Sequence, residues 1–448
     1  MKLNRYLLSS TVVAATGSFL FGFDTAVISG TTTALRQVFG LSSGQLGFTV
    51  ASALIGTILG SMAAGKPVEG LGRKRTLMGL AFLYVISSLG CGLAWNWVSL
   101  LTFRFLGGIA IGIASVVSPM YIAEIAPPES RGRLVAVSQL TTVLGILVAY
   151  LTNYLITLVF TGGPADAVTP AWRWMFGILA LPSALFFFLV LPIPESPRWL
   201  VKRKRIAEAL SVLRQLGNQQ PESLVEEIVA SLKQDQQNTR EPFFVRKYRR
   251  PILLAMMVAT FNQLTGINAL IYYTADIFRM AGAQQTSALL QSVLIGLTCL
   301  LSTALAMTVI DNFGRKRLLM IGAIGMAVCL SITAFGFYQH RGGGLVLTSL
   351  MGYIAFFAFS QGSVIWVFLS EIFPNRVRAQ GQALGCFTHW MWCAVVSWMF
   401  PIIAEQSGGH AFSFFAAMML LQCVLVWKFL PETKGVSLEH IQRILGIA

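Results

Sequence analysis

The chain has 448 residues, of which 55% are hydrophobic and 11% are charged, and its mean hydropathy is +0.69. Soluble domains carry about 25% charged residues, so this composition excludes a soluble protein. The net charge of +15 raises nucleic-acid binding as an alternative, which the positions of the charges must decide.

Twelve apolar runs are long enough for helices of about 20 residues, the length that crosses a bilayer. They lie at 6–28, 47–65, 76–95, 100–121, 134–157, 171–191, 251–273, 289–310, 318–337, 345–370, 380–403 and 411–430. The first run resembles a signal sequence, but it lacks a small-residue cleavage site and contains Asp24, so we expect it to remain in the chain. The sequence therefore predicts an all-α membrane protein with twelve transmembrane helices.

Two charges lie inside predicted spans: Asp24 in the first span and Arg104 in the fourth. An ionisable side chain at membrane depth is costly unless it is paired and used. A lone acid and a lone base in a neutral membrane interior predict a proton relay. A purely structural ion pair is the alternative.

The other basic residues follow the positive-inside rule. If both termini are cytoplasmic, the basic residues on the outer side are only Arg36, Arg173, Arg279 and Arg341. This distribution makes nucleic acid a weak alternative, and the bilayer is the expected partner.

One long polar segment divides the chain into halves of six spans. Its apolar spacing predicts short amphipathic helices, either a gate latch or a solvated tether resting on anionic lipid. The predicted domains are an N-terminal six-helix bundle at 1–191, cytoplasmic linker helices at 192–250, a C-terminal six-helix bundle at 251–430 and a cytoplasmic tail at 431–448.

Nothing in the sequence predicts catalysis. The six cysteines fall inside predicted spans without metal-site spacing, and the four histidines are scattered without a nucleophile or a paired carboxylate. We therefore expect no enzyme activity, no metal and no cofactor. A sugar sensor, the other alternative, usually carries a long soluble tail, whereas the segment after the last span is short.

Three motifs occur twice, once in each half, as internal repeats of transporters do. The pairs are 65–75 (GKPVEGLGRKR) with 311–317 (DNFGRKR), 121–133 with 369–378, and 194–199 with 431–435. Together they resemble the sugar porter family of the major facilitator superfamily, and 20–30 and 118–124 are similar to its bacterial proton-coupled xylose and glucose members.

The resemblance implies two six-helix bundles around a central cavity. It further implies uptake of a monosaccharide, an aldose such as xylose or glucose, by proton symport with alternating access in a bacterial inner membrane. We expect a monomer. A proton-independent facilitative uniporter remains the alternative function.

The repeated motifs place acidic and basic residues at helix ends on the cytoplasmic side, where ion pairs would clamp the bundles together. Exposed pairs contribute only about 0–1 kcal/mol each, so such a network would bias the equilibrium gently. The alternative is that these residues only set topology and helix-end electrostatics. The predicted gate charges are Glu69, Arg73, Glu124, Arg131, Glu195, Asp311, Arg315, Glu371, Arg378 and Glu432.

A sugar site needs amides and indoles near the bilayer midplane. The seventh span supplies Asn262, Gln263 and Asn268. An ideal helix points Gln263 and Asn268 about 140° apart, so both reach one cavity only if the helix loosens, which Gly266 permits. Bonding between helices is the alternative reading of these amides.

The resemblance adds Gln139 as a sugar contact and Trp366 and Trp390 as aromatic walls, although tryptophan also anchors at membrane interfaces. Asn262 departs from the family's usual glutamine. His389 stands where many relatives carry Asn or Gln, and it is expected to bond sugar, sense pH or satisfy a core neighbour. Leu179 replaces an acid of the xylose symporter, which predicts weaker coupling.

Overall fold

The structure, a computed structural model, describes residues 4–128, 130–161, 170–237, 242–309, 313–340, 343–374, 376–432 and 434. These residues form helices joined by short turns, without a strand. Twelve helical segments within them are long and apolar enough to cross a membrane, which confirms the predicted number.

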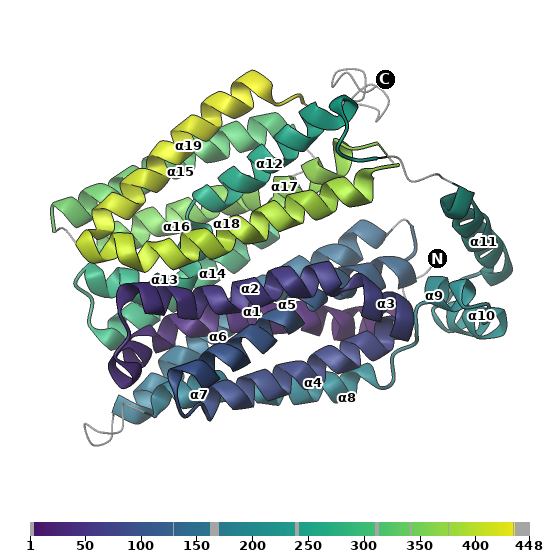
Figure 1. The fold of residues 1–448 in the computed structure, drawn as a ribbon, viewed down its shortest axis with the longest axis horizontal. Coiled ribbons are helices and arrows are strands. Elements are labelled where there is room, and N and C mark those ends of the chain that lie inside the picture. Colours follow the sequence, from purple (N-terminus) through teal and green to yellow (C-terminus); the bar gives the residue numbers. More distant parts are fainter. Residues whose placement is uncertain are drawn as a thin grey trace. The chain divides into compact units, whose positions relative to one another are not determined.

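The described helices belong to two compact units (Figure 1). Unit 1 contains Met1–Asp24, Ile55–Ile146 and Arg173–Arg240, and unit 2 contains Thr25–Leu54, Leu147–Trp172 and Glu241–Ala448. The division therefore falls within three long helices. These are α1 (Arg5–Phe39), α2 (Ser43–Ala63) and α6 (Arg131–Thr161).

Unit 1 also contains most of the shorter helices. They are α3 (Gly65–Leu71), α4 (Arg73–Gly92), α5 (Trp97–Ile125), α7 (Ala171–Gly177), α8 (Ala180–Val190), α9 (Pro197–Lys202), α10 (Ile206–Gln215) and α11 (Pro221–Gln237). Asn96 begins α5 with a capping box, because its side chain accepts from the Ser99 backbone N–H and the Ser99 side chain lies against the backbone N–H of Asn96. α4 packs between α5 and α8 (Figure 1).

Glycines let the helices of unit 1 pack backbone against backbone. A Cβ at Gly22 of α1 would overlap the Thr142 carbonyl of α6, and one at Gly145 of α6 would overlap the Phe19 carbonyl of α1. Gly56 of α2 is in the same position against the backbone of α5. Small residues at helix contacts are how membrane helices gain van der Waals contact when the lipid is as apolar as the side chains.

The linker helices α9, α10 and α11 pack around a small apolar cluster that includes Trp199, Leu213 and Val225. Trp199 Nε1 donates to the Glu69 carbonyl over 2.9 Å, which holds α9 against α3. On exposed α10, hydrogen bonds from the Arg205 guanidinium lower the pKa of the Glu208 carboxyl. The predicted short amphipathic helices are therefore present at this position of the chain.

Unit 2 contains the remaining helices. They are η2 (Arg246–Tyr248), α12 (Arg249–Leu264), α13 (Ile267–Met280), α14 (Gln285–Val309), α15 (Arg315–Tyr338), α16 (Gly344–Phe359), α17 (Gln361–Glu371), α18 (Arg378–Gln406) and α19 (Gly408–Phe429). Its core joins α12, α15, α17 and α19 through side chains such as Val258, Leu319, Phe368 and Val426. Two spans are broken, at Gly266 and at Ser360.

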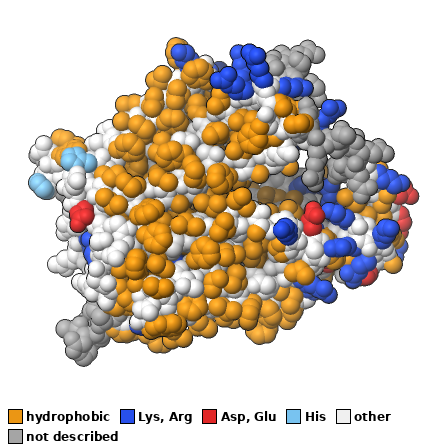
Figure 2. Space-filling model, viewed as in Figure 1, with side chains coloured by type: hydrophobic (Ala, Val, Ile, Leu, Met, Phe, Trp, Pro, Cys, Tyr) orange, Lys and Arg blue, Asp and Glu red, His pale blue; other side chains and the backbone are white. Residues whose placement is uncertain are grey.

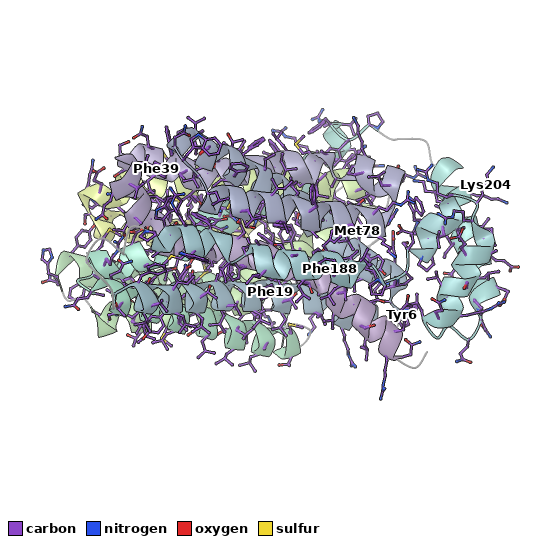
Figure 3. The ribbon with its side chains drawn as sticks, turned by 90° about the horizontal axis from the view of Figure 1, so that it is seen from below. Tyr6, Phe19, Phe39, Met78, Phe188 and Lys204 are labelled. Atoms are coloured by element: carbon purple, nitrogen blue, oxygen red, sulfur yellow. The ribbon has the colours of Figure 1, made fainter. Side chains whose placement is uncertain are left out.

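The surface pattern suits a bilayer. On the helices of each unit, apolar side chains cover the middle and Lys and Arg gather mostly at one end (Figure 2). In unit 1, Tyr6 at the start of α1 and Lys204 after α9 lie toward the same end (Figure 3). Apolar middles and basic ends are the arrangement that the positive-inside rule describes.

Candidate functional site

The buried acid and base of unit 1 meet. Arg104 Nη1 on α5 lies 3.3 and 3.2 Å from the two carboxylate oxygens of Asp24 on α1. The side chains are only 1% and 8% exposed, respectively. One nitrogen makes both contacts, and the distances exceed the 2.7–2.9 Å typical of strong charged hydrogen bonds. The pair is therefore loosely held for a buried one.

The surroundings of this pair leave hydrogen-bonding capacity unused. Arg104 Nε has no partner within the described part of the chain, and the guanidinium carbon lies 5.6 Å from the centre of the Phe176 ring. The buried Tyr84 hydroxyl on α4 is likewise unpartnered among the described residues. Within the described residues, the Nε–H of Arg104 is therefore a donor without an acceptor.

The seventh span breaks where the amides lie. Thr265 follows the end of α12, Gly266 has φ +83°, and α13 begins at Ile267. Glycine adopts this left-handed conformation without the steric cost that a Cβ would bring. The break lets Asn268 Nδ2 donate to Gln263 Oε1 over 2.7 Å, so the two amides predicted to need a loosened helix do come together.

A chain of hydrogen bonds extends from this break. Asn262 Nδ2 donates to the Gln361 backbone carbonyl over 3.2 Å, and Gln263 Nε2 donates to Asn262 Oδ1 over 3.1 Å. Gln263 Nε2 also lies 3.1 Å from each ring nitrogen of His389. This series of hydrogen bonds therefore runs from a backbone carbonyl on α17 through Asn262 and Gln263 to His389 on α18.

Aromatic rings flank His389. The Trp366 and Trp390 ring centres each lie 5.1 Å from the imidazole centre. Trp366 is 40% exposed, whereas Trp390 and His389 are 8% exposed. One indole of this cluster is therefore partly exposed. Gln139, the predicted contact from the first half, lies on α6 in unit 1 with an exposed side chain.

Gln361 was not among the predicted site residues. It is fully buried at the start of α17, and neither side-chain amide atom has a partner in the described part of the chain. A buried amide without a partner costs about 1–3 kcal/mol per unsatisfied group. A polar residue in the interrupted tenth span was the available signal.

A second unpredicted feature is a kink in α13. Tyr273 has φ −121° and ψ 21°, which are not helical. The Tyr150 hydroxyl donates to the Ile271 carbonyl over 2.8 Å, and the Ala275 N–H donates to Ser29 Oγ over 3.1 Å. These two backbone groups would bond each other in a regular helix. Side chains from α6 and α1 replace that bond.

The repeated charges form one arrangement twice, once in each unit. In unit 1, Arg73 pairs with Glu124 through two contacts of 2.8 and 2.6 Å, and Glu195 accepts from the Arg73 N–H over 2.8 Å. The same geometry places Glu195 at the N-terminus of α4, where the helix dipole favours a carboxylate.

Unit 2 repeats this geometry at the N-terminus of α15. Arg315 Nη2 contacts Glu371 Oε1 at 3.1 Å, and Glu432 Oε1 accepts from the Arg315 N–H over 2.8 Å. These pairs lie within units, so they stabilise helix ends inside each unit.

The other predicted gate charges are less closely engaged. Glu69 pairs with Lys202 at 3.2 Å on the surface, whereas Arg131 and Arg378 begin α6 and α18 without a recorded ion pair to another described residue. Asp311 lies outside the described residues. The described residues also contain no cluster of His, Cys, Asp and Glu that could hold a metal ion.

Comparisons with known proteins identify the family of this chain. A family model described as "Sugar (and other) transporter" matches residues 10–445. The chain is 37% identical to the D-xylose-proton symporter of Escherichia coli (strain K12), covering 98% of this chain and 96% of that one. It is 36% identical to a glucose transport protein of Synechocystis, covering 98% and 97%. The inward-open structure of the E. coli xylose transporter XylE superposes with a TM-score of 0.87 at 36% identity, covering 98% of this chain and 100% of that one.

Proposed function

Because this chain belongs to the sugar transporter family, we propose that it takes up a monosaccharide by proton symport with alternating access. The observation that carries the proposal is the buried contact between Asp24 and Arg104. A charged pair inside a multi-pass membrane protein is costly unless it does work, and a proton is the ion that a carboxylate binds directly. The relatives named as proton symporters support the same assignment.

In the proposed cycle, ionised Asp24 holds Arg104 and keeps α1 and α5 in one arrangement. Protonation removes the negative charge and frees Arg104 for another acceptor. Because the ionised and protonated states favour different packings of these helices, proton and sugar move together. The loose single-nitrogen contact supports a pair that can be released.

We propose that the sugar binds at the polar break in unit 2. Gln263 and Asn268 present amides, the exposed face of Trp366 stacks on sugar C–H groups, and Trp390 closes the wall. Asn262 and His389 orient Gln263. Gln139 of unit 1 is kept as a further proposed sugar contact on the family resemblance alone. An aldose such as xylose or glucose has the alternating hydroxyls and C–H faces that this mixture of groups suits.

We further propose the finer cellular setting. The bundles are 1–191 and 251–430, with 192–250 and the tail 431–448 on the cytoplasmic side of a bacterial inner membrane. The protein acts as a monomer in the bilayer without a nucleic-acid partner. The basic residues at one end of the helices support this orientation.

A proton-independent uniporter is the rival function, and Leu179 is the residue that favours it. Leu179 is 2% exposed next to α8, where an acid would be a second buried proton carrier. Proteoliposomes without an imposed pH difference distinguish the two functions. Symport predicts that added D-xylose or D-glucose makes the external medium alkaline, whereas sugar counterflow without any pH change would establish the uniporter.

A further inference from the structure

The hydrogen bonds that link the amide side chains of unit 2 have fixed donors and acceptors. A backbone carbonyl at one end of this network sets them. The Gln361 carbonyl can only accept, so Asn262 must point its Nδ2 toward it. Asn262 Oδ1 then faces Gln263, which must donate to it through Nε2. Gln263 Oε1 is already engaged by Asn268 Nδ2. Each amide therefore has one permitted orientation.

The hydrogen-bond network ends at His389, where the Gln263 amide needs an acceptor. Gln263 Nε2 carries a second N–H, and this nitrogen lies 3.1 Å from each imidazole nitrogen. A neutral imidazole has one nitrogen that accepts, whereas both nitrogens of the charged form donate. A proton on His389 therefore places two donors against the Gln263 donor.

Flipping Gln263 does not relieve this conflict. The flip would place Oε1 against Asn262 Oδ1 and Nε2 against Asn268 Nδ2. Correcting the first of these clashes by flipping Asn262 would place Oδ1 against the Gln361 carbonyl, which cannot flip. The network thus tolerates one protonation state of His389.

We infer that His389 is a positioning residue of the sugar site that acts only in its neutral form, so that its protonation weakens sugar binding. This inference rests on the proposed function. It gives the protein two proton-linked groups of opposite effect, because protonation of Asp24 drives the cycle and protonation of His389 disorders Gln263 and Asn268. Uptake then declines on the acidic side.

Few other ionisable groups act on His389. The charged residues of the helices packed around it stand at helix ends: Arg249 and Arg250 begin α12, Asp276 and Arg279 end α13, Glu371 ends α17, Arg378 begins α18 and Glu405 ends it. Arg249 is about 20 Å of helix away from Gln263. Nearer titratable groups are the Cys386 and Cys393 thiols of α18 and the Tyr272 hydroxyl of α13.

The test compares the pH dependence of sugar binding in the full-length protein in nanodiscs, with D-xylose and D-glucose as probes. His389→Gln keeps an acceptor at every pH, and His389→Leu removes it. His410→Gln is the matched control, because His410 is exposed on α19. Binding is measured by tryptophan fluorescence from pH 8 down to the lowest pH at which every variant stays folded.

We expect the ratio of the wild-type Kd to the His389→Gln Kd to rise as the pH falls, by up to about tenfold per pH unit for one linked proton. His410→Gln should follow wild type, and His389→Leu should bind about tenfold more weakly than His389→Gln at neutral pH. Because Asp24 is the same in all variants, it cancels from the ratio.

A ratio that does not change with pH, while all variants bind sugar, overturns the inference and leaves the proposed function standing. His389→Leu binding as tightly as His389→Gln would show that no acceptor is needed, with the same consequence. If no probe binds to wild type at any pH, the proposed function fails, and the inference falls with it.

Discussion

Buried polar side chains in this protein act through the partners that they meet in space. Asp24 and Arg104 are each a charged residue in an apolar span of the sequence. In the structure they form an ion pair with each other. Gln263 similarly engages Asn262, Asn268 and His389 at once. Removing one member leaves the others buried without partners, which costs more than the net stabilisation of the bond itself.

Asp24→Asn should abolish proton-coupled accumulation while sugar counterflow continues. The amide keeps the size of the carboxylic acid but cannot exchange a proton, so the coupling is lost and the sugar site remains. The measurement is accumulation of labelled sugar in proteoliposomes with an imposed pH difference, with counterflow as the control. Accumulation equal to that of wild type would refute the relay.

Gln263→Leu should weaken sugar binding by about tenfold or more, because the sugar loses a hydrogen-bonding amide at about 1–3 kcal/mol and Asn268 loses the partner that orients it. Gln422→Leu is the matched control, since Gln422 is 1% exposed with both amide atoms unpartnered among the described residues. That control should bind sugar normally and melt at the same or a higher temperature. Equal affinity losses in both variants would contradict the assigned site.

At the scale of elements, the structure combines closely packed helices with interrupted helices. α1 and α6, and likewise α2 and α5, approach backbone to backbone at glycines. α12 and α13 are instead separated at Gly266, and α13 bends at Tyr273. The close contacts hold unit 1 together, and the breaks in unit 2 place polar backbone and side-chain atoms where a regular helix would have none.

Gly56→Ala should lower the melting temperature, because the new Cβ would overlap the backbone of Phe105 and Ile109, which cannot move aside. Overpacking of this kind costs about 1–3 kcal/mol. Gly79→Ala on α4 is the control: nothing lies within 4 Å of its Cβ position, and alanine favours the helix. Thermal unfolding in detergent measures both, and a Gly56→Ala variant as stable as Gly79→Ala would contradict the packing.

At the scale of the whole molecule, the twelve apolar helices and the family assignment agree on a multi-pass membrane transporter. The acidic and basic motifs repeat in the two units with the same roles at the N-termini of α4 and α15. This repetition within units differs from the expected clamp between bundles, since the same charges already bond within their own unit. Their part in gating stays a prediction.

The proposed orientation predicts which loops face the outside. Gln284→Cys, between α13 and α14, should react with a membrane-impermeant maleimide added to intact cells, whereas Gln219→Cys, between α10 and α11, should react only after lysis. Both native side chains are exposed, and wild type is the control because its described cysteines are buried or half-buried. The reverse labelling pattern would place the termini outside.

The number of membrane spans and their helical structure were predictable from the sequence. The residues at which the helices end were less predictable. The first apolar run stops at 28, whereas α1 continues to Phe39. Thr31 and Thr32 lie in that extension and donate to the Ile28 and Ser29 carbonyls of their own helix. Hydropathy counts such hydroxyls as polar, although the helix already satisfies them. The break at Gly266 was predicted from the amides that require it.

The sequence by itself determined the membrane class, the twelve spans, the sugar transporter family and most of the polar candidates. These follow from composition and from motifs that are read along the chain. Only the tertiary structure decided which groups meet: Asp24 with Arg104, Gln263 with His389, and the Gln361 carbonyl with Asn262. The physical reason is that a buried polar group must find its partner across space, and that partner is chosen by helix packing between residues distant in the chain.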